Sequence, residues 1–199
     1  MKKTIGSAAL AGGLLLAALT GCETGSPAAS DPSPQPSAPD KLTSAIAFPQ
    51  TITLQATDKS GEKTFTLDKG WDESCPKPEE KVAELFKGCE GRVSAGYESA
   101  DGIRVAIDFY VFPAATGSMD DEILAAKKSK AFDAMPDPLG LDTKLPRTWN
   151  ATSIKTYMVV CAAGPASAEK LKEREKTAGL FTNPACDWGV NQIKGIFPS

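Results

Sequence analysis

The sequence predicts an α+β domain in which an antiparallel sheet carries two helices on one face. Apolar residues alternate with polar ones in several runs of strand length, and elsewhere they recur at helical spacing. The expected strands cover 51–56, 64–67, 92–99, 103–112, 153–161 and 186–193, and the expected helices cover 78–87 and 118–135. From the second strand onward this is the ferredoxin-like βαββαβ order, with an extra strand at each end.

The first expected helix, over 78–87, has recognisable ends. Pro78 suits the first turn, where its missing N–H needs no partner, and Gly88 can end the helix. Between them Val82, Leu85 and Phe86 share one face. We expect this face to pack on the sheet.

The second expected helix begins at Ser118, whose hydroxyl can cap the first turn while Asp121 stands at the capping-box spacing. Negative charge stabilises the first turn of a helix, so the acidic run 120–122 indicates a helix start rather than a calcium site. The expected core face consists of Leu124, Ala131, Phe132 and Met135.

The last third of the chain is expected to hold a strand over 153–161 and a closing strand over 186–193. Between them, residues 166–178 have helical propensity, but Leu171 is nearly their only large apolar residue. They are expected to form a solvated helix or a mobile loop.

The two central strands form a hairpin whose register decides which side chains share a face. A two-residue turn at 101–102 mixes apolar with polar side chains on one face. A three-residue loop over 100–102, with Gly102 in the left-handed conformation, separates them. The apolar face then consists of Val93, Ala95, Tyr97, Ile103, Val105, Ile107, Phe109 and Val111.

The opposite face of this hairpin is polar, and it is the candidate binding face. It consists of Arg92, Ser94, Glu98, Arg104, Asp108 and Tyr110. The expected facing pairs are Glu98 with Arg104, Ser94 with Asp108, and Arg92 with Tyr110. Gly96 and Ala106 are expected to leave a shallow groove. The alternative is a solvated sheet face held by cross-strand pairs, each of which contributes about 0.2–1 kcal/mol.

Residues 1–21 have the order of a secretory signal peptide. Lys2 and Lys3 precede an apolar stretch over 5–19, and small residues follow it. A membrane-spanning helix needs roughly 20 consecutive apolar residues. This stretch of about 15 is too short to span comfortably.

The signal peptide leads into Leu19-Thr20-Gly21-Cys22, which resembles the bacterial lipobox. The resemblance implies cleavage before Cys22 and a diacylglyceryl group on its thiol. Two acyl chains hold a protein stably on a bilayer, whereas one binds only marginally. We therefore expect a lipoprotein of the cell membrane that faces the extracytoplasmic side. The alternative is a secreted protein cut elsewhere, with Cys22 as an unpaired thiol.

Residues 22–45 are expected to be the lipidated cysteine and a stalk rich in Pro, Ser and Ala. Such a segment cannot bury enough apolar surface to fold, and its prolines favour extended polyproline conformations of about 3.1 Å per residue. Residues 46–199 are expected to form one extracytoplasmic α+β domain, held away from the bilayer by this stalk.

Five cysteines leave one unpaired, and assigning Cys22 to lipid leaves an even set suited to an oxidising compartment. That set is Cys75, Cys89, Cys161 and Cys186. Proximity favours Cys75 with Cys89 and Cys161 with Cys186. The first pair brackets an expected helix, so the chain must double back before the Cα atoms come within about 7 Å. The other two connectivities therefore stay open.

The composition disfavours several chemistries. The chain has no histidine, which removes Ser-His and Cys-His nucleophiles and the commonest zinc or copper ligand. The four cysteines lack paired CxxC spacing, so we expect no metal and no cofactor. The formal net charge is −3, and it is −5 without Lys2 and Lys3. Negative charge disfavours nucleic acid and anionic lipid as main partners.

Three tryptophans are candidates for stacking on sugar rings of a cell wall. Trp188 lies near Cys186 and is expected to pack over a disulfide, whereas Trp71 and Trp149 are expected in loops.

Several features together look like actinobacterial cell-envelope lipoproteins. They are the lipobox, the Pro/Ser-rich stalk, the segment Tyr97-Glu98-Ser99-Ala100-Asp101-Gly102 before an apolar strand, and the late Cys186-Asp187-Trp188. The domain is similar to small extracellular sensor-like domains of that group. The resemblance implies a location at the cell envelope and no particular mechanism.

The sequence thus predicts a membrane-anchored lipoprotein whose domain, without catalysis, binds a ligand or a cell-wall or envelope protein through the candidate binding face. One alternative is an envelope enzyme that uses Asp108 and Glu98 as acid and base, which requires a concave pocket with perturbed carboxyl groups. Another is an accessory subunit of a membrane complex.

Overall fold

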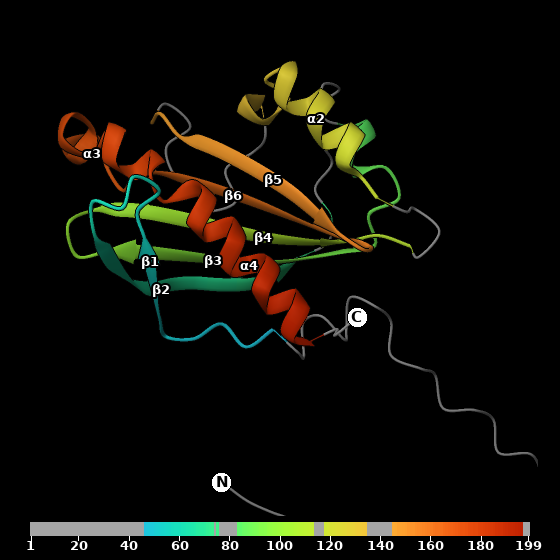
Figure 1. The fold of residues 1–199 in the computed structure, drawn as a ribbon, viewed down its shortest axis with the longest axis horizontal. Coiled ribbons are helices and arrows are strands. Elements are labelled where there is room, and N and C mark those ends of the chain that lie inside the picture. Colours follow the sequence, from blue (N-terminus) through green and yellow to red (C-terminus); the bar gives the residue numbers. More distant parts are fainter. Residues whose placement is uncertain (1–45, 74, 76–82, 114–117, 135–144, 197–199) are drawn as a thin grey trace, which may run out of the picture. The chain divides into compact units, whose positions relative to one another are not determined.

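The computed structural model describes residues 46–73, 75, 83–113, 118–134 and 145–196. These residues form an α+β fold with one antiparallel sheet in the order β1-β2-β3-β4-β6-β5 (Figure 1). The strands are β1 (Thr51–Gln55), β2 (Glu62–Glu73), β3 (Gly91–Ser99), β4 (Ile103–Val111), β5 (Thr148–Ile154) and β6 (Tyr157–Pro165). The helices are α2 (Asp120–Lys128), α3 (Leu171–Gly179) and α4 (Thr182–Ile196), with short 3-10 turns η1 (Glu84–Phe86), η3 (Ala131–Ala134) and η4 (Ala168–Lys170). The predicted α+β class and antiparallel sheet are confirmed.

The central hairpin of β3 and β4 forms in the predicted register. Gly102 has a φ of 84°, in the left-handed region that glycine adopts without strain. All three predicted facing pairs are present: Glu98 with Arg104, Ser94 with Asp108, and Arg92 with Tyr110. The alternation of side chains along these two strands therefore determined their faces correctly.

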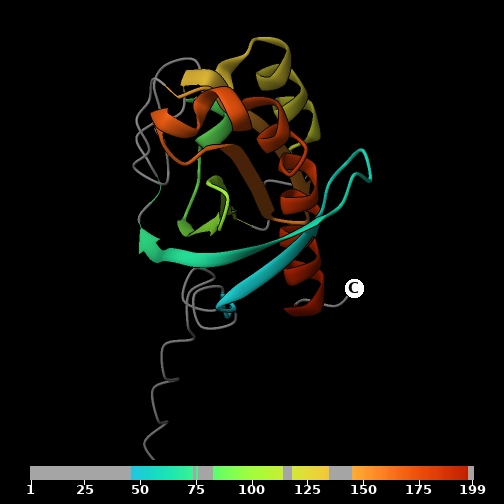
Figure 2. The ribbon, with the colours of Figure 1, turned by 90° about the vertical axis from the view of Figure 1, so that its left-hand side faces the viewer.

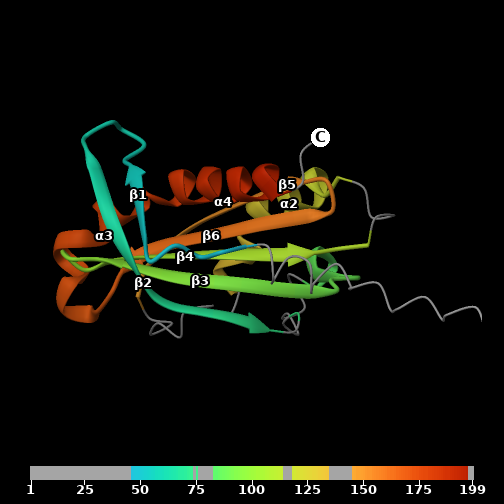
Figure 3. The ribbon, with the colours of Figure 1, turned by 90° about the horizontal axis from the view of Figure 1, so that it is seen from below.

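Helix α4 covers the apolar face of this hairpin (Figure 3). The helix approaches the sheet closely at Gly189, where an added Cβ would lie 2.8 Å from a methyl group of Val159 and 3.2 Å from one of Ile107. The sheet curls, so that β1 and the first half of β2 bend round toward α4 (Figure 2). The first core therefore contains Ile52, Leu54 and Phe65 from these strands as well as Phe181 and Ile193.

A second core lies on the opposite face of the sheet, where η1, α2 and η3 pack against β4, β5 and β6. Its buried members are Leu85, Phe86, Tyr110, Phe112, Met119, Ile123, Ala126, Ala131, Phe132, Ala151, Met158 and Val160. The described parts of the two expected helices, η1 and α2 with η3, pack on this second face, whereas α4 packs on the other face in a segment that was expected to be a strand. The expected arrangement with all helices on one face is therefore not confirmed.

The ferredoxin-like order is not confirmed either, because the expected closing strand over 186–193 is part of helix α4. The buried residues of this helix recur at helical spacing, namely Thr182, Ala185, Cys186, Gly189 and Ile193. Four of these five residues are small or polar, so the sequence shows no clear apolar stripe at helical spacing. The larger apolar residues of the segment suggested the alternation of a strand, which the backbone does not follow. The sheet consequently ends with the hairpin of β5 and β6, and the helix α4 packs over it.

The expected strand over 153–161 is also corrected, because it is divided between β5 and β6. The chain turns at Lys155, which has a φ of 52°. Lysine is uncommon in this left-handed conformation, so the sequence carried no turn signal here.

The two expected helices are shorter than predicted. Lys130 has a φ of 54° and separates α2 from η3 within 118–135. Leu124, expected in the core, is 48% exposed, and Ile123 and Ala126 are buried instead. Ala131 and Phe132 are buried as predicted, and Met135 lies outside the described residues.

Of the expected helix over 78–87, residues 78–82 lie outside the described part of the chain and 84–86 form η1. Leu85 and Phe86 are buried as predicted. Residues 166–178, expected as a solvated helix or a loop, contain η4 and most of α3.

Candidate binding surface

The six residues of the candidate binding face lie on the face of β3 and β4 that points away from α4. The structure divides them into two groups with different surroundings. Four lie toward the end of the hairpin that is remote from its loop, and we call Arg92, Ser94, Asp108 and Tyr110 the base half. Glu98 and Arg104 lie next to the loop.

The base half is a buried polar network. The guanidinium of Arg92 donates to Oδ1 of Asp108 at 3.0 Å, and the hydroxyl of Ser94 donates to the same oxygen. The exposed fractions of Arg92 and Asp108 are 7% and 1%, and Ser94 is also buried. The paired charges therefore have little contact with solvent, and this part of the face does not offer an open recognition surface.

The second core explains why the base half is buried. The guanidinium of Arg92 lies 5.7 Å from the ring centre of Tyr110, and that ring packs edge-on against Phe86 of η1 at 4.7 Å. Gly96 and Ala106 are buried as well, so the expected shallow groove is not open to solvent at these residues. Segments outside the hairpin thus cover a face that looked polar and open in sequence.

The end of the face next to the hairpin loop is more accessible. Arg104 donates to Asp68, which stands at an irregularity of β2 where the register shifts between Leu67 and Lys69. The side chains of Arg104 and Asp68 are 16% and 44% exposed. Sequence reasoning missed Asp68 because the bulge that places it has no sequence signal of its own.

Arg147 and Trp149 extend this accessible end toward the other edge of the sheet. Trp149 pairs with Ala162, and Ala162 pairs with Ala106 on the polar face of β4. The guanidinium of Arg147 lies 5.5 Å from the ring centre of Trp149, and both residues are half-buried. We call Asp68, Glu98, Arg104, Arg147 and Trp149 the loop half. It presents charged groups of both signs beside an aromatic ring.

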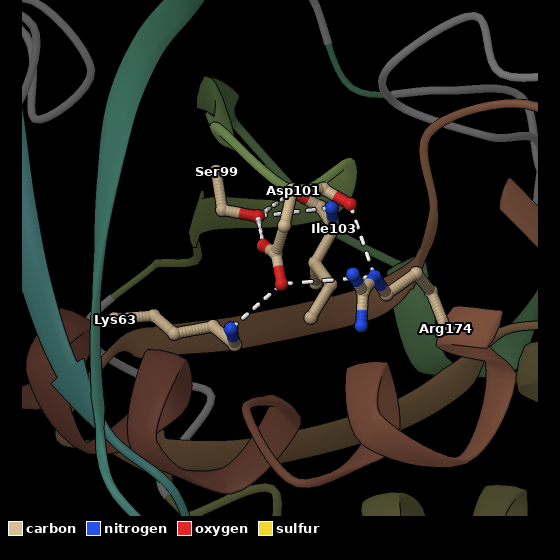
Figure 4. Close-up of polar contacts among 5 residues, drawn as sticks. All are labelled: Lys63, Ser99, Asp101, Ile103 and Arg174. Atoms are coloured by element: carbon tan, nitrogen blue, oxygen red, sulfur yellow. Dashed lines mark hydrogen bonds and ion pairs between the residues drawn. The ribbon is translucent and has the colours of Figure 1, made fainter.

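The hairpin loop beside the loop half is fixed by Asp101 (Figure 4). Its carboxylate accepts hydrogen bonds from Lys63 and Ser99, both at 2.7 Å, and Nε of Arg174 lies 3.6 Å away. Nε of Arg174 also donates to the carbonyl of Asp101 at 3.1 Å. These contacts join the loop to β2 and to α3.

The surroundings of Asp101 favour its ionised form. Burial alone would raise its pKa, but the hydrogen bonds from Lys63 and Ser99, with the charges of Lys63 and Arg174, outweigh it and hold the pKa below its usual value. The cluster thus connects the hairpin loop with β2 and with α3.

The geometry gives little support to acid and base catalysis by Asp108 and Glu98. Glu98 faces Arg104, which is four residues from Asp108 along β4, and four residues of a strand span roughly 13 Å. Paired catalytic carboxyl groups in glycosidases, for comparison, lie about 5–9.5 Å apart. Within the described residues no group of three or more His, Cys, Asp or Glu side chains could hold a metal ion.

The four cysteines pair as sequence proximity favoured. The Cα atoms lie 6.0 Å apart in the disulfide of Cys75 with Cys89, and 5.5 Å apart in that of Cys161 with Cys186. The first pair is half-buried, whereas the second lies in the first core and links α4 to β6. Cys22, the expected lipid site, lies outside the described residues.

The tryptophans differ from their expected positions. Trp149 is in β5 and Trp71 is in β2, although both were expected in loops. Trp188 of α4 packs edge-on against Tyr97, with ring centres 6.2 Å apart. Trp149 belongs to the loop half, whereas Trp71 pairs in register with Ser94 of the base half.

Comparison of the chain with protein-family models, with curated proteins and with solved structures finds no match. In the part of the chain that the structure describes, no helix is both long enough and apolar enough to cross a membrane. The site must therefore be interpreted from its own chemistry.

Proposed function

We propose that this chain is an extracytoplasmic lipoprotein, anchored through Cys22, whose domain binds a ligand or an envelope protein through the loop half without catalysis. The observation that carries the binding proposal is the contrast within one sheet face. The base half is buried around Asp108, while the loop half keeps Arg104, Arg147 and Trp149 partly accessible beside Asp68.

The composition of the loop half suits recognition. Arginine and tryptophan are enriched among residues that dominate binding energy at protein interfaces, because they combine a large contact area with directed hydrogen bonds. The side chains of the loop half are supported by strands, and the adjacent loop is tied to β2 and α3 through Asp101. A surface held in this way loses little conformational entropy when it binds.

The binding proposal is tested in the membrane-anchored protein by mild crosslinking on whole cells. Arg104→Ala combined with Arg147→Ala should remove the crosslinked envelope partner seen with the unaltered protein, whereas Lys128→Ala, an exposed position on α2, should not. Asp108 is unsuitable for this test because its burial couples it to stability. An unchanged crosslinking pattern in the double variant would contradict the assignment of the loop half.

The same crosslinking experiment distinguishes two kinds of partner. If the protein is an accessory subunit, the crosslinked species should contain integral membrane proteins that co-purify in a fixed ratio. If it binds a ligand or a wall component, the species should be retained with the wall fraction.

The anchor is tested separately by mass spectrometry of the intact protein extracted from membranes. Removal of residues 1–21 together with the added mass of a diacylglyceryl group on Cys22 is the expected result. Cys22→Ser should release the protein from the membrane fraction. An unmodified Cys22 in the mature protein would sink the lipoprotein proposal.

A further inference from the structure

A pocket of about 270 Å³ lies between η1 and α2, and it shares no residue with the loop half. Its lining consists of Glu84, Leu85, Glu122, Ala125, Ala126 and Ser129. All six residues belong to η1, to α2 or to the residue that follows α2. The pocket is therefore the space left where these two segments meet.

The floor of this pocket is apolar and fixed. Leu85 and Ala126 are 3% and 7% exposed, and both belong to the second core. Their neighbours Phe86 and Ile123 are buried in the same core, which anchors η1 and α2 on the sheet. Because both walls are held from behind, the pocket exists without a ligand to form it.

The rim of the pocket carries two negatively charged side chains. Glu84 and Glu122 are exposed carboxylates, and none of the six lining residues is a lysine or an arginine. The pocket extends along α2 from Glu122 in its first turn to Ser129 after its end, and Lys127 and Lys128 of the last turn do not line it.

The ion pair that Glu84 makes with Lys87 leaves room for another cation. Nζ of Lys87 lies 3.8 Å from Glu84, but the two side chains are 78% and 86% exposed. Such a pair in full contact with solvent contributes little to stability and is easily exchanged. Glu84 can therefore turn toward an external cation at small cost.

We propose that this pocket binds a lysine or arginine side chain of a protein partner. The aliphatic part of such a side chain packs on Leu85 and Ala126, as long basic side chains commonly do on apolar surface, while its charged end lies between Glu84 and Glu122. Anionic groups are repelled from the same rim. The proposal does not depend on the loop half, because it involves none of its residues.

The test uses NMR of the mature lipidated chain in nonionic detergent, with two probes of nearly the same shape. Nα-acetyl-lysine methylamide should cause saturable shifts at the amides of Ala125 and Ala126, whereas the norleucine analogue, which lacks the charge, should bind about fivefold more weakly. A lysine probe that causes no saturable shift, or equal affinity for both probes, would overturn the proposal.

Three variants complete the test. Glu84→Gln combined with Glu122→Gln should weaken the lysine probe about fivefold, to the level of the norleucine probe, because both carboxylates are lost. Glu90→Gln, an exposed carboxylate outside the pocket, is the matched control and should leave the affinity unchanged. Lys87→Ala should strengthen binding by removing the competing cation. Unchanged affinity in the double variant would also reject the site, and circular dichroism checks that each variant folds.

Discussion

The base half and the loop half belong to one face of the same sheet, yet their environments differ. Both follow from one register, in which Arg92, Ser94 and Asp108 alternate with apolar side chains just as Glu98 and Arg104 do. Around Asp108 the face is buried, whereas around Arg104 it remains partly open. Alternation along a strand therefore determines on which face of the sheet a residue lies, but it does not determine which other segments of the chain cover that face.

The cover comes from segments remote from the hairpin in sequence. Leu85 and Phe86 of η1 precede it, and Ile123 of α2 follows it. Together they bring apolar side chains against Tyr110 and leave the paired charges of Arg92 and Asp108 beside the second core. Buried polar groups require such pairing, because an isolated charge in that position is strongly destabilising.

The largest expected effect tests the burial of the base half. Asp108→Ala removes the carboxylate that binds Arg92 and Ser94, and it leaves a buried guanidinium without this partner. Breaking a buried ion pair from one side costs about 3–5 kcal/mol. The free energy of unfolding, measured with denaturant, should fall by this amount.

Asp68→Ala is the matched control for that prediction in the loop half. Asp68 pairs with Arg104 as Asp108 pairs with Arg92, but its side chain is 44% exposed. Ion pairs in contact with solvent contribute about 0–1 kcal/mol. Equal losses of unfolding free energy in Asp108→Ala and Asp68→Ala would contradict the difference in burial between the two halves.

A smaller effect is expected at the hairpin loop. Gly102→Ala forces a residue with a Cβ into the left-handed conformation, and that Cβ would lie 2.9 Å from Cγ of Lys170. The strain should cost about 1–2 kcal/mol in the free energy of unfolding. A larger loss of stability than in Asp68→Ala would show that the loop half is stabilised more by the backbone conformation of the adjacent loop than by its ion pair. A stability equal to that of the unaltered protein would contradict it.

The smallest expected effect is the pH dependence of the contacts that Asp101 makes with Lys63, Ser99 and Arg174. The pKa of Asp101 is lower in the folded protein than in the unfolded chain, so its contribution to stability is present above the unfolded pKa of about 3.9 and is lost as the pH falls through the folded value. The side chains of Asp101, Lys63 and Arg174 are each 29% exposed, which limits the contribution to less than about 1 kcal/mol.

This dependence is measured by comparing the unaltered protein with Asp101→Asn in denaturant unfolding. The difference between them should be present at neutral pH and should shrink below about pH 4. A difference that grows as the pH falls would show that the pKa is shifted in the opposite direction.

Several features of the fold could be predicted because their causes are local. The three-residue loop with Gly102 follows from the distribution of polar residues along two neighbouring strands. Proximity in the chain favoured the pairing of Cys75 with Cys89 and of Cys161 with Cys186, although it left the other two connectivities open. By contrast, the turn at Lys155 and the break at Lys130 use left-handed lysines that no local rule identifies.

The candidate site could be predicted only in part, because local register places some of its residues and tertiary structure places the others. Glu98 and Arg104 follow from the hairpin register, whereas Asp68 depends on a bulge in β2, and Arg147 and Trp149 reach the face through β5 and β6. The pocket beside α2 could not be foreseen, because Leu85 and Ala126 meet only when η1 and α2 pack on the same core.

The sequence by itself determined the α+β class, the register of the central hairpin, and the expectation of an exported, lipidated chain. These depend on the order of neighbouring residues, which alternation, turn chemistry and short motifs express directly. Only the tertiary structure decided that residues 182–196 form a helix over the sheet and that Asp108 is buried. Burial is a property of surfaces brought together from distant parts of the chain, and no local pattern contains it.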